Sequence, residues 1–440
     1  MGLFARVVAG AVLFAAAACT PLGLNTASTN IQKEEAAHPA VLGAFEGDAP
    51  VTSAEEWTRR RVPLLRAAFE KEVYGPVPQE LHGSVVSRRV VDTNFANGAG
   101  VLEEIDVRIG EGESAPRFRI AIALPRGAAA DHKVPLILNQ NFCGNAGTFD
   151  MQELSDGGCM NHGAMSSVIR LIFGKYIMTG PNQMILERGY AYATMYAGPF
   201  AADDPAAAQV QLEALGRMLP EGRKPQGVVA VWAAGFGWAL DVLEADPRID
   251  ASKTAVWGHS RQGKAALLAA AFDPRIEAVI PLQAGKGGAT LTRAYAGESV
   301  KQITKSYPHW FAPNYTRYAD HEADIPVDQH QLIAMVAPRP VMLGNGWKDV
   351  WSDPNGAYRS ALGASPVYQL MGKRGLGQAG MKDSPEIKGA PSNKDRAEMG
   401  ELEWFIRPGG HGVRVVDWDE MLAFCDRWIG PQKNSEPVKQ

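Results

Sequence analysis

Residues 254–272 read TAVWGHSRQGKAALLAAAF, and this stretch constrains the fold more than any other part of the chain. An apolar segment at residues 254–257 leads into a glycine-flanked turn at residues 258–263. A run of alanine and leucine follows, and both are strong helix formers. The order is therefore strand, sharp turn and helix. This is the plan of a nucleophile elbow, which would lift the side chain of Ser260 off the edge of a sheet, at the positive end of a helix.

The same turn is similar to a phosphate-binding loop, because GHSRQGKA matches GxxxxGK followed by Ser or Thr in all but its last position. Ala265 stands at that position and cannot ligate magnesium, so the match to a nucleotide-binding loop fails where the metal would be held. The elbow pattern G-x-S-x-G is imperfect too, since Gln262 replaces its second glycine and Gly263 comes one residue later. The local pattern alone therefore does not separate an esterase from a plain strand, turn and helix.

Strand-like and helix-like segments alternate along the chain. Residues 134–138 are a continuous apolar run, as expected of a buried parallel strand, and the polar residues 139–145 follow where hydrolases of this type have an oxyanion-hole loop. Further strands are predicted at 83–91, 101–109, 117–124, 189–197, 276–282, 339–344 and 403–407, and helices at 53–73, 228–244, 356–370 and 417–429. This alternation predicts an α/β protein with a mostly parallel sheet, and with the elbow it predicts a three-layer α/β-hydrolase fold.

The N-terminus has the composition of an export signal. Residues 1–19 contain one positive charge, an apolar core and three alanines before Cys19, which is also the pattern of a bacterial lipoprotein acylated at that cysteine. We therefore expect an exported protein, either periplasmic or anchored by lipid in the outer membrane. Residues 20–50 are expected to be a flexible linker, and residues 51–440 a single domain that acts as a monomer.

Composition excludes several classes of function. The formal net charge is −4 and basic residues are scattered among acidic ones, so nucleic acid is not an expected partner. Cys143 and Cys159 are candidates for a disulfide in an oxidising compartment, whereas Cys425 is expected to be a buried thiol. Neither the cysteines nor the nine histidines have metal-ligand spacing, so we expect no metal and no cofactor.

A serine nucleophile needs a base, and the base needs an acid to orient it. His411 follows the last predicted strand in RPGGHG, the place of the histidine in the hydrolase order of Ser, acid and His. Asp349 follows the preceding strand in NGWKDVWSD and is the candidate acid, whereas Asp353 stands before Pro354 and is predicted to cap a helix. Taken singly, a loop histidine is usually a solvated bystander and a loop aspartate a turn residue. Their order relative to Ser260 favours catalysis.

The sequence resembles the glucuronoyl esterases of carbohydrate esterase family 15, especially their bacterial members, from about residue 57 to residue 429. The shared motifs are GHSRQGK at 258–264, PHWF at 308–311, PVDQH at 326–330, APRP at 337–340 and RPGGHG at 407–412. Several motifs in order are more specific than one elbow. The motif of the family is G-[CH]-S-R-x-G-K, so the late glycine is expected.

The resemblance implies a role for each matching residue. Ser260 would be the nucleophile and His411 its base, and Arg261 would stabilise the oxyanion through its guanidinium and its backbone N–H. Lys264 would bind hydroxyls of a uronic acid, and Trp351 corresponds to an aromatic residue that flanks the sugar. Structurally, Arg261 and Lys264 could instead be solvated residues of the first helical turn. A cation at the N-terminus of a helix is destabilised by the helix dipole. Two cations at this position therefore favour a functional role over a purely structural one.

One departure from the family concerns the acid. Members often carry it in a segment like N-E-S-G-x-G-G, but this chain reads LQAGKGG at residues 282–288, with Gln283 in place of the acid. An amide can orient an imidazole but cannot stabilise an imidazolium as a carboxylate does. Asp349, at the alternative acid position of some relatives, therefore takes the role, or the activity is degraded or different. Gln283 and Trp310 of PHWF are placed with the substrate-binding residues.

These observations predict a serine esterase that cleaves esters of glucuronic or 4-O-methyl-glucuronic acid, as in lignin–carbohydrate linkages on glucuronoxylan, by a Ser260, His411 and Asp349 mechanism. A carbohydrate acetyl esterase or a general carboxylesterase is the alternative within the same class. A saccharide-binding protein with a degraded triad is the alternative from another class, and Gln283 is the residue that keeps it open.

Overall fold

The computed structural model describes residues 38–142, 144–156, 173–294, 296–376, 395–396 and 400–431. The predicted export signal, the lipidation site at Cys19 and the Cys143–Cys159 disulfide lie outside the described residues. Cys425 is buried as a free thiol, as predicted. In the part of the chain that is described, every helix is too short or too polar to cross a membrane.

The strands form one sheet in the order β1-β2-β3-β5-β4-β6-β7-β8-β10-β9. Six of them, from β5 to β10, are parallel to their neighbours, and antiparallel pairs extend the sheet at both edges. The strands are β1 (Gly83–Asn94), β2 (Gly100–Ile109), β3 (Arg117–Pro125), β4 (Val134–Asn141), β5 (Ala191–Tyr196), β6 (Ile249–His259), β7 (Ala278–Leu282), β8 (Val341–Gly346), β9 (Asp395–Arg396) and β10 (Leu402–Arg407). The predicted mostly parallel sheet is confirmed.

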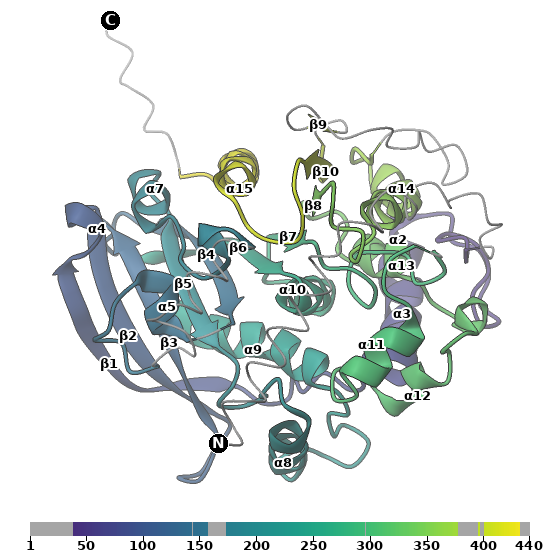
Figure 1. Ribbon diagram of the computed structural model, residues 1–440, viewed down its shortest axis with the longest axis horizontal. Coiled ribbons are helices and arrows are strands. Elements are labelled where there is room, and N and C mark those ends of the chain that lie inside the picture. Colours follow the sequence, from purple (N-terminus) through teal and green to yellow (C-terminus); the bar gives the residue numbers. More distant parts are fainter. Residues whose placement is uncertain are drawn as a thin grey trace, which may run out of the picture.

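Helices cover both faces of this sheet (Figure 1). The longer ones are α3 (Val62–Phe69), α8 (Pro205–Gly216), α9 (Val228–Leu243), α10 (Arg261–Phe272), α14 (Pro354–Leu370) and α15 (Val415–Trp428). The shorter ones are α2 (Ala54–Glu56), η1 (Trp57–Arg61), η2 (Glu70–Tyr74), α4 (Phe95–Gly98), α5 (Asn145–Phe149), η3 (Lys175–Ile177), α7 (Asn182–Glu187), α11 (Val300–Ser306), α12 (Pro313–Thr316), η4 (Glu322–Asp324) and α13 (Gln329–Ala334). The α/β-hydrolase fold is thus built in three layers, with the sheet in the middle.

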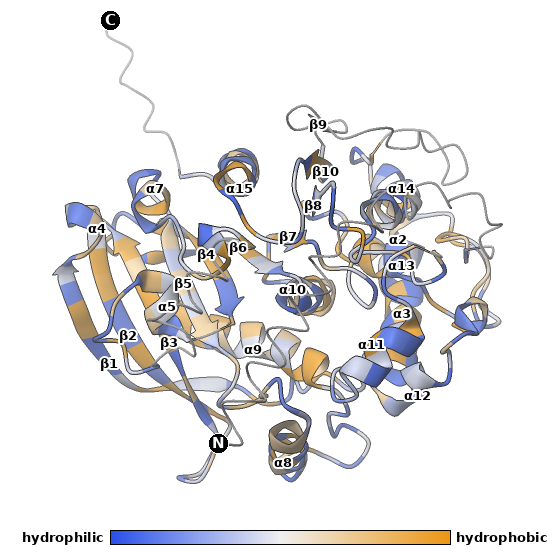
Figure 2. Cartoon of the chain, viewed as in Figure 1, coloured by the Kyte–Doolittle hydropathy of each residue, from blue (hydrophilic) through white to orange (hydrophobic). Residues whose placement is uncertain are grey.

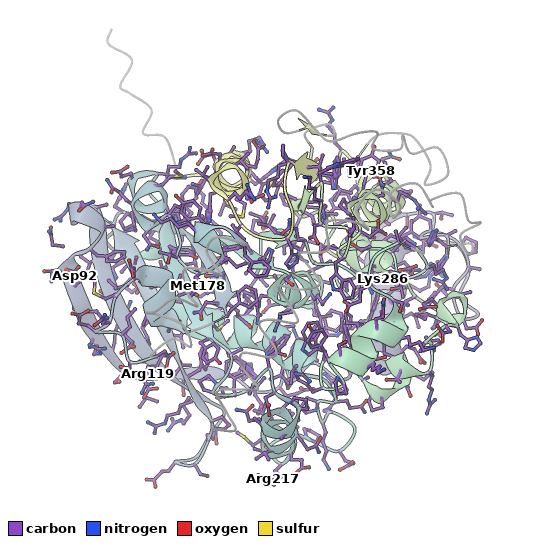
Figure 3. All side chains as sticks on the ribbon, in the orientation of Figure 1. Asp92, Arg119, Met178, Arg217, Lys286 and Tyr358 are labelled. Atoms are coloured by element: carbon purple, nitrogen blue, oxygen red, sulfur yellow. The ribbon has the colours of Figure 1, made fainter. Side chains whose placement is uncertain are left out.

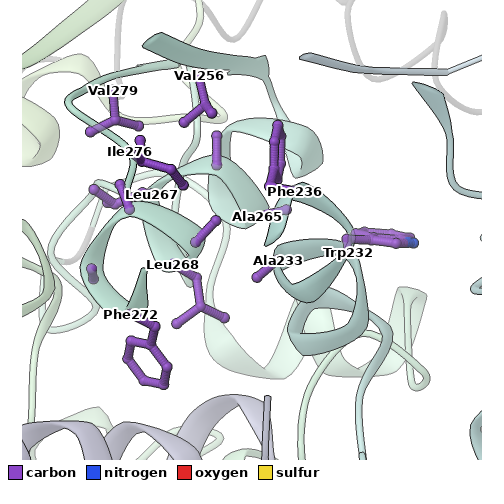
Figure 4. Close-up of a cluster of buried hydrophobic side chains, with 14 of the residues drawn as sticks. Trp232, Ala233, Phe236, Val256, Ala265, Leu267, Leu268, Phe272, Ile276 and Val279 are labelled. Atoms are coloured by element: carbon purple, nitrogen blue, oxygen red, sulfur yellow. The ribbon is translucent and has the colours of Figure 1, made fainter. Parts of the chain in front are cut away.

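Two apolar cores hold the layers together. The larger contains residues of α3, α9, α10 and α14, and the smaller contains residues of α7 and α15. Figure 4 shows the centre of the larger core, where Phe236 of α9 and Leu267 of α10 pack near Val256 of β6 and Val279 of β7. Apolar residues occupy most of α9 (Figure 2), because this helix is buried on nearly all sides. The core fixes α10, and thereby the turn that precedes it.

The domain begins earlier than predicted. Ser53 caps the first helical stretch as expected, with its hydroxyl accepting from the N–H of Glu56 at 3.2 Å. Val41 and Phe45, however, are buried in the larger core, within the range expected to be a linker. Arg61 reaches back and donates to the Asp48 carboxylate at 3.1 Å, which ties this segment down. The end of the predicted linker is therefore part of the folded domain.

Candidate active site

Ser260 lies in the turn between β6 and α10 in a strained backbone conformation. Its φ is 57° and its ψ is −124°, a region that L-residues rarely adopt and that is concentrated at functional sites. A Cβ on Gly258 would lie 2.1 Å from the carbonyl oxygen of Gln262, and one on Gly263 would lie 2.9 Å from that of Gly258. The backbones approach so closely that both positions require glycine. This contact explains why the second glycine stands at 263.

His411 and Asp349 meet at the carboxyl edge of the sheet. Asp349 follows β8 and His411 follows β10, and these strands are neighbours. The Nδ1–H of His411 donates to Oδ2 of Asp349 at 2.7 Å, and Oδ1 of Asp349 accepts from the N–H of Ser352 at 3.3 Å. The side chain of Asp349 is only 1% exposed. Asp349 is thus a buried carboxylate that accepts a hydrogen bond from the imidazole, and its role as the catalytic acid stays a prediction.

The bond to Asp349 fixes the tautomer of His411. Because Nδ1 carries the proton, Nε2 is left to accept one from a nucleophile. The Ser260 hydroxyl has no hydrogen bond to another described residue and its side chain is partly exposed. The Ser260 backbone N–H donates to the Leu282 carbonyl at 2.9 Å, which holds the turn against β7. The pairing of the Ser260 hydroxyl with Nε2 of His411 therefore stays a prediction.

Gln283 contacts a different histidine. Its Oε1 accepts from Nε2 of His259 at 2.7 Å and from the N–H of Gly412 at 2.9 Å, and its Nε2 donates to the Gly410 carbonyl at 3.2 Å. The ring of His259 packs against that of His411, with centroids 4.4 Å apart. Burial, with the nearby His411 as a second cause, lowers the pKa of His259 well below its usual range. His259 is therefore neutral. The amide of Gln283 is fully engaged with His259 and with the backbone of Gly410 and Gly412.

Arg261 is the first residue of α10. Its guanidinium forms an ion pair with Asp203 and lies over three aromatic rings, at 5.1 Å from the centroid of Trp310 and 5.8 Å from those of Phe142 and Tyr307. Phe142 belongs to the predicted oxyanion-hole loop after β4. The backbone N–H of Arg261 lies at the positive end of a 12-residue helix, where a developing oxyanion is stabilised.

Lys264 is a buried cation. Its Nζ donates to the carbonyls of Ala284 and Lys286 at 2.6 Å each, and it lies 5.9 Å from the centroid of Trp310. Burial lowers the pKa of Lys264, and burial raises the pKa of Glu298, which interacts with it electrostatically. Oε1 of Glu298 is buried with no hydrogen-bond partner among the described residues. The pair forms a polar site with unused bonding capacity.

The neighbouring predicted residues differ in exposure. Trp351 is 47% exposed, so its ring is accessible to a ligand, whereas Trp310 is 4% exposed and donates through Nε1 to Asp203. Lys286, labelled in Figure 3, is buried and donates to the Ala294 carbonyl. The substrate contacts predicted for Trp310 and Gln283 stay predictions.

Asp353 accepts from the N–H of Gly356 at 3.0 Å at the start of α14, so its predicted capping role is confirmed.

Three residues of this site were not identified from the sequence: Asp203, His259 and Glu298. His259 was visible beside Ser260, but nothing in the pattern showed that it would be buried against His411. Asp203 is 58 residues from Arg261, and only the packing of the β5–α8 loop against α10 brings them together. Glu298 precedes α11, a helix that was not predicted.

Several known proteins are similar to this chain in sequence and in fold. The family model described as "Glucuronyl esterase, fungi" matches residues 172–372. The carbohydrate esterase MZ0003, from an unknown prokaryotic organism, is 32% identical over 92% of each chain. A promiscuous esterase of carbohydrate esterase family 15, from a marine bacterial metagenome, has a solved structure that is 31% identical, with a TM-score of 0.76 over 91% of this chain and 98% of its own. A glucuronoyl esterase from Solibacter usitatus is 30% identical, with a TM-score of 0.73 over 90% and 98%.

Proposed function

The chain belongs to carbohydrate esterase family 15, the glucuronoyl esterases, and we propose that it hydrolyses esters of glucuronic or 4-O-methyl-glucuronic acid at lignin–carbohydrate linkages of glucuronoxylan. Membership makes it a carboxylic ester hydrolase. The observation that carries the proposal is the 2.7 Å bond between His411 and Asp349, beside a strained Ser260 and two cations of one helix. Cations next to the nucleophile suit a polar sugar acid better than a lipid acyl chain.

The reaction proceeds in two steps at Ser260. Its Oγ attacks the ester carbonyl while Nε2 of His411 takes the hydroxyl proton, and Asp349 stabilises the resulting imidazolium. Arg261 stabilises the oxyanion through its side chain and backbone N–H. The C–O bond to the alcohol then breaks, and His411 gives its proton to the leaving oxygen. Water attacks the acyl-enzyme in the same way, which releases the uronic acid and restores Ser260.

Lys264, Glu298 and Trp351 select the substrate by contacting its sugar. Lys264 donates two of its three N–H groups to backbone carbonyls, so the third N–H group can donate to a sugar hydroxyl. Oε1 of Glu298 lacks a donor among the described residues, and a sugar hydroxyl can supply one. The exposed ring of Trp351 offers a flat apolar surface for a sugar face.

A carbohydrate acetyl esterase is the second candidate, because a relative that matches nearly the whole chain is described as promiscuous. The decisive experiment compares kcat/KM for a glucuronate methyl ester with that for an acetylated sugar, using purified protein and the Ser260→Ala variant as the blank. A preference for the acetyl ester would overturn the uronate assignment. Turnover that survives Ser260→Ala would overturn the mechanism. A non-catalytic saccharide-binding role is disfavoured, because the carboxylate of Asp349 contacts His411.

The site of action is a separate part of the proposal. An apolar N-terminus that ends in Cys19 supports export and lipid attachment at that cysteine, and polymeric xylan lies outside the cell. Palmitate labelling of the full chain in a bacterial host, with Cys19→Ser as the control, tests the anchor. Label that remains on the Cys19→Ser variant would contradict it.

A further inference from the structure

The Asp203 carboxylate lies at the centre of a hydrogen-bonded network around Arg261. Asp203 precedes α8 and is brought against the start of α10. One oxygen, Oδ2, pairs with Arg261, and the other, Oδ1, accepts from Nε2 of His309 at 2.9 Å and from Nε1 of Trp310 at 2.7 Å. The charge of Arg261 and the bonds from His309 and Trp310 lower the pKa of Asp203, despite an opposing effect of burial, so the carboxylate is ionised.

The aromatic rings restrict the same guanidinium from other sides. Tyr307 stacks on Trp310 with centroids 3.9 Å apart and planes 9° from parallel, and Arg261 lies over both rings and over Phe142. These residues come from the loop after β4 and from the segment between α11 and α12. A free arginine side chain samples many rotamers, and this freedom must be lost before its planar group can bind in one geometry. Here most of that freedom is lost before a substrate binds.

We propose that Asp203 is a positioning residue, which holds the guanidinium of Arg261 where the oxyanion forms. This inference rests on the proposed function, since it presumes acyl transfer at Ser260. His309 and Trp310 fix Asp203 on one oxygen, and Asp203 uses the other to fix Arg261. A guanidinium has five N–H donors in a fixed fork, so the same group can bind a carboxylate and an oxyanion at once. Preorganised charge costs no reorganisation during the reaction, which is why its placement affects the rate.

A double-mutant cycle of Asp203→Asn and Arg261→Gln tests this role. Asparagine keeps the shape of residue 203 but removes the charge, so we expect kcat to fall about 10- to 100-fold with KM changed less than about threefold. In the Arg261→Gln background, the same change should lower kcat by less than about threefold, because there is no guanidinium left to position. Equal losses in both backgrounds, or a loss confined to KM, would overturn the proposal.

Two further variants keep the test decisive. Trp310→Phe removes one donor to Asp203 and keeps an aromatic ring, so it should lower kcat by less than Asp203→Asn does, and it replaces that variant if Asp203→Asn fails to fold. Asp320→Asn breaks the exposed ion pair with Lys301, 2.6 Å in length, and should leave the kinetics at the wild-type level. A wild-type kcat for Trp310→Phe, or a loss in Asp320→Asn as large as that in Asp203→Asn, would contradict the positioning role.

The choice of substrate separates this inference from the proposed function. The cycle is measured on a glucuronate methyl ester and on p-nitrophenyl acetate, which has no sugar. Turnover of the acetate alone would reject the uronate assignment, yet the cycle on the acetate would still decide the role of Asp203. If wild-type protein turned over neither ester, both proposals would be overturned.

Discussion

Gln283 accepts a hydrogen bond from His259 at 2.7 Å and makes none with the ring of His411. Through the same amide it contacts the backbone of Gly410 and Gly412, on either side of His411. The residue that replaces the acid of the family therefore supports the loop that carries the base, whereas Asp349 contacts the imidazole itself. The two roles differ in chemistry, and kinetics can separate them.

We expect Asp349→Asn to lower kcat far more than Gln283→Ala. An asparagine cannot stabilise the imidazolium and favours the wrong tautomer, which costs about 10⁴-fold in a comparable serine hydrolase triad. Gln283→Ala removes two hydrogen bonds to the loop and one to His259, and we expect kcat to fall about tenfold or less, in the range of one to two net hydrogen bonds. Steady-state kinetics on a glucuronate ester provide the comparison. The reverse ranking would return the acid role to position 283.

Restoring a carboxylate at position 283 should not improve the enzyme. In Gln283→Glu one oxygen can still accept from His259 and Gly412, but the other would face the Gly410 carbonyl, and two acceptors repel. The new charge would also be buried, where an unpaired carboxylate is costly. We expect lower kcat and a lower Tm than in the wild type, measured by kinetics and calorimetry. A rise in kcat would show that residue 283 can act on His411 after all.

The parts of the site that could be predicted are those set by local sequence. Ser260, Asp349 and His411 each follow a strand of a parallel sheet, so alternation along the chain was enough to place them at one edge. The capping role of Asp353 could be predicted because a helix cap bonds a backbone N–H only three residues further along the chain. The amide contacts of Gln283 could not be predicted, since its partners lie 24, 127 and 129 residues away along the chain.

The errors at the N-terminus have a similar cause. Residues 38–50 read as a tether because they continue a stretch that is polar and rich in alanine, yet Val41 and Phe45 are buried. They are held because Asp48 pairs with Arg61, which no local pattern shows. An irregular segment can bury a few large side chains against an existing core without the hydrophobic periodicity of a helix or strand, so a search for periodicity does not detect it.

Glu298 should contribute to sugar binding and little to the chemical step. We expect Glu298→Gln to raise KM for a glucuronate ester about tenfold, as for the loss of one hydrogen bond to a charged group, and to change kcat/KM for p-nitrophenyl acetate by less than about twofold. The acetate lacks the sugar hydroxyls, so it serves as the internal control. Glu221→Gln, whose side chain is 87% exposed, is the matched variant and should leave both substrates unaffected. An equal loss on both esters would place Glu298 in the reaction itself.

His330 should make the protein sensitive to acid through its contact with the N-terminal segment. Its Nε2–H donates to the Pro39 carbonyl at 2.8 Å, and the groups that face it are Asp328, His38 and Arg293. Burial lowers its pKa to about 4, and the charge of Asp328 only partly opposes this. The unfolded chain therefore binds a proton near pH 6.5 that the folded protein does not take up until about pH 4.

The stability that depends on neutral His330 is thus fully present above pH 6.5 and is lost as the pH falls toward 4. The loss is on the order of 3 kcal/mol for a difference of this size between the two pKa values. We expect His330→Gln, which keeps an N–H donor but cannot titrate, to show a flatter dependence of unfolding free energy on pH over this range. Denaturant unfolding at several pH values measures it, with the exposed His132→Gln as the control. Asp328 titrates below this window because its pKa is depressed, so parallel curves for wild type and His330→Gln would contradict the assignment to His330.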